Sequence, residues 1–78
     1  MSLQAGADEH ALVEALDFDR FAEIARLAAL AASYWHSIAL AAERGDILTT
    51  RVHAHQVRNV TVEAFAIVKT LGEPEPSP

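Results

Sequence analysis

The chain of 78 residues has no cysteine, so it offers no disulfide, iron–sulfur cluster or zinc–thiolate site. Aromatic residues make up only 6% of the sequence, although 51% of it is hydrophobic, and alanine accounts for much of the difference. Such a composition favours closely packed helices over a sheet core. Positive charge is also scarce, and the net charge of −5 argues against broad binding to the phosphate backbone of nucleic acids.

Targeting and membrane-spanning signals are lacking as well. The N-terminus has neither the basic start nor the long apolar run of a signal peptide. The apolar run from Leu27 to Ala32 is too short to span a bilayer. We therefore expect a soluble, cytoplasmic protein with no membrane partner. A chain of this length is near the size at which a single core becomes marginal without a partner.

The apolar periodicity predicts an all-α domain over residues 8–72, with helices at about 8–16, 18–44 and 47–71. Residues 1–7 are small and polar, and residues 73–78 alternate proline with glutamate or serine, so both ends are expected to be disordered.

Local residue types mark the ends of these helices. Asp8 and Asp17 are suited to cap the first two, so we expect a break in the chain at Asp17. Gly45 supplies a left-handed residue at the end of the second helix, and Asp46 caps the third. A turn this short requires the two long helices to lie antiparallel, as a helical hairpin.

The segment 18–44 carries two apolar seams about 100° apart around the helix. The first seam consists of Phe21, Ile24, Ala28, Ala31, Ala32, Trp35, Ala39 and Ala42. The second seam consists of Leu27, Leu30, Tyr34, Ile38 and Ala41. The segment 47–71 has one broad apolar face, formed by Ala54, Val57, Val60, Ala64, Phe65, Ile67, Val68 and Leu71.

One antiparallel neighbour cannot cover both seams, so we expect two hairpins to pair as a homodimeric four-helix bundle. The residues expected at this interface are Phe21, Ile24, Leu27, Ala28, Leu30, Ala31, Tyr34, Trp35, Ile38 and Ala39. The alternative is a three-helix monomer, in which the short helix 8–16 folds back over the second seam.

Histidine is the only candidate for reactive chemistry. In a hairpin that turns at 45–46, His36 lies level with His55 and within about one turn of His53, which makes the three imidazoles weak metal-ligand candidates. However, neighbours two apart on a helix do not face each other, and no carboxylate recurs three or four residues from any of them. Ser33 also lacks a nearby base. We therefore expect no catalytic residue, metal or cofactor, and a ligand-binding bundle using these histidines and Trp35 is the alternative.

Three basic residues, Arg51, Arg58 and Lys69, lie along one stripe of the segment 47–71. The stripe is a possible docking edge for an acidic protein segment, but pairing with acids of the neighbouring helix is the simpler interpretation. Three charges without interleaved aromatics are few for a nucleic-acid surface. In architecture alone the hairpin is similar to Rop, a plasmid copy-control protein that dimerises as two hairpins and binds paired RNA loops, so a Rop-like nucleic-acid adapter is a further alternative.

These patterns favour a small, non-enzymatic interaction or regulatory module that acts through homodimerisation and protein–protein contacts.

Overall fold

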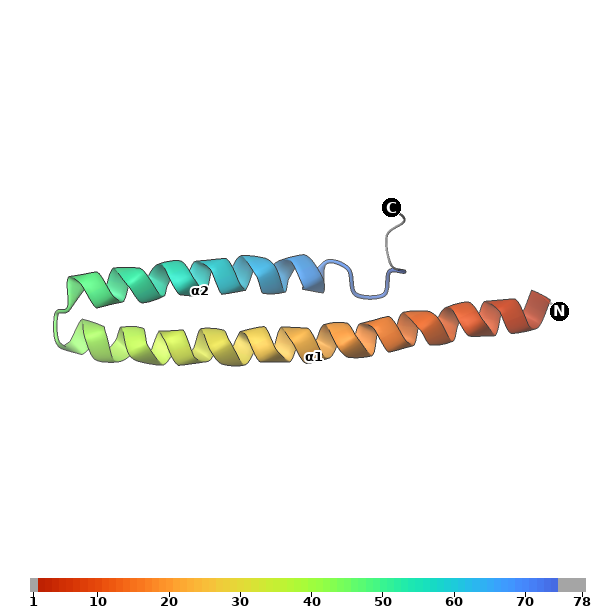
Figure 1. The fold of residues 1–78 in the computed structure, drawn as a ribbon, viewed down its shortest axis with the longest axis horizontal. Coiled ribbons are helices and arrows are strands. Elements are labelled where there is room, and N and C mark those ends of the chain that lie inside the picture. Colours follow the sequence, from red (N-terminus) through yellow and green to blue (C-terminus); the bar gives the residue numbers. More distant parts are fainter. Residues whose placement is uncertain (1, 75–78) are drawn as a thin grey trace.

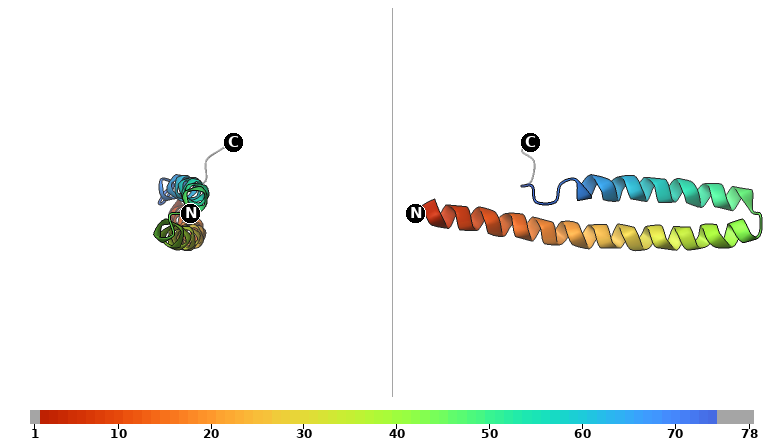
Figure 2. Two further views of the ribbon diagram at one scale, coloured as in Figure 1. Left: turned by 90° about the vertical axis from the view of Figure 1, so that its left-hand side faces the viewer. Right: turned by 180° about the vertical axis from the view of Figure 1, so that it is seen from behind.

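Two antiparallel helices make up the fold, α1 (Ser2–Glu43) and α2 (Ile47–Val68), as Figure 1 shows. The computed structural model describes the backbone of residues 2–74 and the side chains of residues 14–74. The predicted all-helical hairpin is confirmed. Because α1 has 42 residues and α2 has 22, the N-terminal half of α1 extends past the end of α2 in both side views of the molecule (Figures 1 and 2).

The turn between the helices is built as the sequence predicts. Gly45 has a φ of 67°, the left-handed conformation that glycine adopts without a Cβ clash. The backbone N–H groups of Gly45 and Asp46 donate to the carbonyls of Ala42 and Ala41 at 3.0 and 2.9 Å. The Asp46 carboxylate then accepts from the N–H of Thr49 at 3.0 Å and caps α2.

The expected break at Asp17 is wrong, because α1 continues through this residue and includes residues 2–7 and 8–16. Asp17 does not cap a helix start. Its Oδ1 instead accepts hydrogen bonds from the N–H of Gly72 at 2.9 Å and from Arg20 Nη1 at 3.1 Å. With its carboxylate engaged in this way, and with no glycine or proline between residues 7 and 44, nothing interrupts the helix.

The C-terminal end of α2 is held against α1 by the same group of residues. The helix ends at Val68, three residues before the expected end, and the chain then turns as far as Gly72, which has a φ of 81°. Arg20 Nη1 donates to the carbonyls of Thr70, at 2.7 Å, and of Glu73. Of the tail expected to be disordered, residues 75–78 lie outside the described part of the chain.

The hairpin core uses the second seam of α1. Among residues 14–74, the buried apolar side chains are Leu27, Ala41, Val57 and Val60. The other members of the second seam are half-buried, whereas most of the first seam is exposed. One chain therefore covers only one of the two seams that the periodicity predicts.

Candidate interaction surface

A shallow groove of about 380 Å³ runs between α1 and α2 on one side of the hairpin. Its walls are almost entirely apolar and come from both helices: Leu27, Ala28, Ala31, Ala32, Trp35, Val60, Thr61, Ala64, Phe65 and Val68. The two large aromatic rings are far from buried, since Trp35 is 58% exposed and Phe65 is 59% exposed. Apolar rings at this level of exposure are a feature of surfaces that bind another molecule.

The groove is part of a larger apolar side of the hairpin. We define this apolar side by its exposed members on the two helices, which are Phe21, Ala28, Ala32, Trp35, Ala39, Phe65 and Val68. They recur at the three- and four-residue steps of one helical face on each helix. The opposite side carries Arg26, which donates hydrogen bonds to Glu23 of the same helix. Its positive charge is stabilised first by Glu23 and to a smaller extent by Glu63 of α2.

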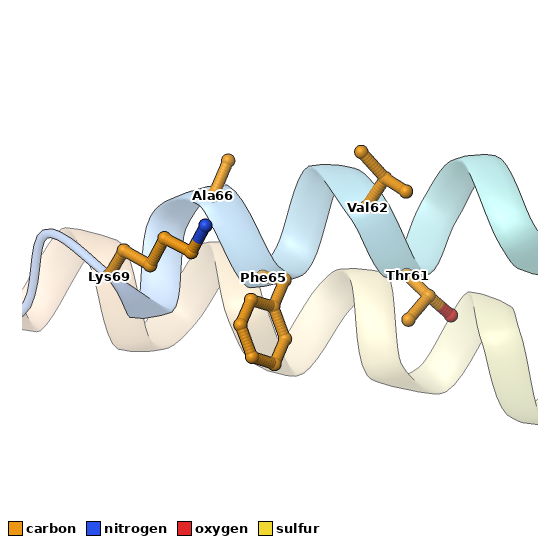
Figure 3. A pocket seen from close by; sticks show the side chains of 5 residues that line it. All are labelled: Thr61, Val62, Phe65, Ala66 and Lys69. Atoms are coloured by element: carbon orange, nitrogen blue, oxygen red, sulfur yellow. The ribbon is translucent and has the colours of Figure 1, made fainter.

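A positively charged side chain, Lys69, lies next to Phe65 on the α2 wall of the groove (Figure 3). Thr61, Val62, Phe65, Ala66 and Lys69 line a second hollow of about 340 Å³ on this helix. The Lys69 ammonium lies 5.6 Å from the centroid of the Phe65 ring, close enough for a cation–π contact. Phe65 therefore separates an apolar groove on one side from positive charge on the other.

The other two members of the basic stripe, Arg51 and Arg58, are exposed. Within the part of the chain whose side chains are described, neither has an ion-pair or hydrogen-bond partner. The simpler interpretation, in which they pair with acids of the neighbouring helix, is therefore not realised within one chain. The positive charges of the stripe, on Arg51, Arg58 and Lys69, are therefore exposed to solvent along the edge of the apolar side.

The histidines are not brought together. His36 and His55 are exposed, whereas His53 is half-buried between the helices. The His53 ring stacks on Tyr34, with ring centroids 5.8 Å apart, and its Nδ1 lies 2.7 Å from Gln56 Oε1. Across the described residues, no group of three or more histidine, aspartate or glutamate residues is placed to hold a metal ion. His53 serves as a packed polar residue of the hairpin.

The pKa shifts of Glu23, Arg26 and Asp46 are caused mainly by residues three positions away along the chain. Hydrogen bonding to Arg26 lowers the pKa of Glu23, and the same contact raises the pKa of Arg26. The pKa of Asp46 is lowered first by hydrogen bonding to the Thr49 side chain and then by the Thr49 backbone N–H. These shifts belong to helix-surface and capping interactions, away from the groove.

The structure divides the predicted interface residues into three groups. Phe21, Ala28, Trp35 and Ala39 are exposed on the apolar side. Leu27 is buried by α2 within one chain. The half-buried remainder is Ile24, Leu30, Ala31, Tyr34 and Ile38.

Six residues that line the groove were not among the predicted interface residues: Ala32, Val60, Thr61, Ala64, Phe65 and Val68. Phe65 and Val68 belong to the broad apolar face of the segment 47–71, which the sequence assigns to the hairpin core. In the structure they lie at its margin, 59% and 42% exposed. The signal that could have identified them is the width of that face, since one neighbouring helix covers only part of a wide apolar arc.

Within residues 2–74, neither helix is both long enough and apolar enough to cross a membrane. In comparisons with protein-family models, curated proteins and solved structures, nothing matches this chain.

Proposed function

We propose that the protein is a small, non-enzymatic helical interaction module that acts as a homodimer. Two hairpins pair through their apolar sides and contribute four helices to one bundle. The observation that carries this proposal is the exposure of Trp35 and Phe65 together on either side of an apolar groove. Large aromatic side chains in such positions supply much of the binding free energy at protein–protein interfaces.

The accessible surface of the chain supports the need for a partner. The chain exposes 6085 Å² at a mass of 8.4 kDa. A compact monomer of this mass exposes about 4,600 Å², so the hairpin exposes about 1,500 Å² more. A standard protein interface removes about 800 Å² from each partner. A second hairpin packed on the apolar side would therefore remove about half of this excess.

Alanine at the proposed interface suits close packing of helices. Ala28, Ala32 and Ala39 are exposed on the apolar side and are spaced by four and seven residues, one above the other on α1. Side chains this small let a neighbouring helix approach closely, because interaxial distance depends on the side chains at the contact. Trp35 lies in the same row and supplies the bulk that the alanines lack.

The non-enzymatic part of the proposal rests on where the candidate chemical groups lie. His36 and His55 are exposed, and His53 is occupied by Tyr34 and Gln56. Ser33 is an exposed residue within a regular helix, whose backbone N–H groups are engaged in helical hydrogen bonds. Such a helix provides no oxyanion site beside the hydroxyl.

The test is the mass in solution, measured by light scattering over a concentration series. We expect a dimer of twice 8.4 kDa. Ala28→Glu should weaken dimerisation by at least about a hundredfold, because it places a carboxylate without a partner in an apolar interface. Ala29→Glu is the matched control, since Ala29 is exposed but does not line the groove.

A wild-type protein that stays monomeric at every concentration would refute the proposal. An Ala28→Glu variant that dimerises as well as Ala29→Glu would show that the apolar side is not the interface.

A further inference from the structure

Among residues 2–74, half of α1 has no helix beside it. The 22 residues of α2 run along the C-terminal half of the 42-residue α1, and the N-terminal half, residues 2–22, extends past the end of α2 (Figure 2). Asp17 and Arg20 in this half bind the turn that follows α2. Because α1 is continuous through Asp17, this half cannot fold back over its own hairpin. Most of the stability of a helix in a protein comes from tertiary packing, and this half lacks a neighbouring helix. The continuous path of α1 is therefore incompatible with the three-helix monomer that the sequence left open, and a second copy of the chain can supply the cover.

The lengths of the two helices indicate how a second copy of the chain would be aligned along the first. Residues 2–22 of α1 are nearly equal in number to the 22 residues of α2. If two α1 helices pair antiparallel and are centred near Ala22, each N-terminal half lies along the whole length of α2 of the other hairpin and covers its groove. At every level three helices then pack side by side, and neither the groove nor the N-terminal half is left uncovered.

Charge favours the same arrangement. Residues 2–22 contain five acids, Asp8, Glu9, Glu14, Asp17 and Asp19, against one base, Arg20, which is a net charge of −4. Arg51, Arg58 and Lys69 lie along the α2 edge of the partner's apolar side, with Arg51 beyond the end of the groove. Opposite potentials that meet across an interface determine orientation and exclude wrong arrangements. Pairing with both turns at the same end would instead set the two acidic halves beside each other.

We infer that the groove is occupied by the N-terminal half of α1 from a second copy of the chain, with the two α1 helices antiparallel and centred near Ala22. This inference rests on the proposed homodimer and adds the segment that fills the groove. The four helices of the dimer are then offset along its long axis. The two turns lie at opposite ends, and the basic stripe of each hairpin faces the acidic half of the other.

The register is measurable in the full-length protein with paired spin labels. The chain has no native cysteine, so Ala22→Cys and Glu43→Cys each give one label per chain. Both positions are exposed, and neither lines the groove. With a rise of 1.5 Å per residue, the offset dimer places the two labels at residue 22 at nearly the same level, and the labels at residue 43 about 60 Å apart along the axis.

Other arrangements give different pairs of distances. Hairpins that overlap fully with opposite turns would place the labels about 30 Å apart along the axis at both positions. Hairpins with both turns at the same end would place the two labels close together along the axis, both at residue 22 and at residue 43. Either result, obtained on a protein that light scattering shows to be a dimer, overturns the offset register and leaves the proposed homodimer intact. A protein that is monomeric by light scattering overturns both.

Discussion

The carboxylate of Asp17 in α1 accepts a hydrogen bond from the backbone N–H of Gly72, 55 residues later in the chain, at 2.9 Å. The contact secures the turn that follows α2 at the point where α1 begins to extend alone. Asp17→Ala should speed amide hydrogen exchange at Gly72 and lower the free energy of unfolding by about 1 kcal/mol. Asp19→Ala is the control, because Asp19 is exposed and the Gly72 N–H donates to Asp17 instead. Equal exchange rates at Gly72 in the two variants would show that Asp17 does not hold this turn.

Gly45→Ala should destabilise the hairpin through the backbone alone. The φ of 67° at this residue is left-handed, and a Cβ added there would meet no atom within 4 Å. An alanine in this conformation costs about 1–2 kcal/mol. Gly45→Asn should lose less, since asparagine tolerates the left-handed region. Chemical denaturation at fixed protein concentration compares the two, and an alanine variant as stable as wild type would show that the turn rearranges.

The contribution of Asp46 to stability should disappear in acid. Hydrogen bonds from Thr49 lower its pKa in the folded state. Its contribution is therefore complete above the unfolded-state pKa of about 3.9 and is lost as the pH falls through the folded-state value. An asparagine at this position can still cap the helix but carries no charge. Wild type should be more stable than Asp46→Asn at pH 6, with a gap that narrows below about pH 4. A difference in stability between the two proteins that stays constant down to about pH 2 would contradict a lowered pKa of Asp46.

Leu27 should dominate the small core of the hairpin. It is 1% exposed, whereas Leu40 on the same helix is 44% exposed. Leu27→Ala should lower the free energy of unfolding by about 3 kcal/mol, because it removes buried methyl groups and leaves a cavity. Leu40→Ala should cost much less. Urea unfolding of both variants, at one protein concentration, would reveal similar losses if α2 packed elsewhere on α1.

The basic stripe should strengthen dimerisation in a salt-dependent way. Arg51 and Arg58 have no ion-pair partner among the described residues of their own chain. Replacing both with glutamine should weaken the dimer about tenfold at low salt and less at high salt. Arg26→Gln, on the opposite side of the hairpin and paired with Glu23, should leave dimerisation unchanged. Sedimentation equilibrium at two ionic strengths makes the comparison, and a parallel response in both variants would remove the stripe from the interface.

How far the sequence predicts the fold depends on the range of the interaction concerned. The turn at Gly45 and Asp46 was predicted residue by residue, because a left-handed conformation and an N-cap depend on atoms a few residues apart. The break at Asp17 was predicted by the same logic and is wrong. An aspartate before a helical pattern looks like a cap locally, and only the distant Gly72 shows where its carboxylate is used.

The two apolar seams of α1 follow from the sequence alone, since a period of about 3.6 residues places them on the helix without reference to any neighbour. Which seam the hairpin covers was decided by the tertiary structure. Packing of α2 buries Leu27 and Ala41, and leaves Trp35 exposed beside Phe65. The physical reason is that periodicity determines where side chains lie around one helix, whereas the rotation of two helices about their axes is settled only when their side chains meet.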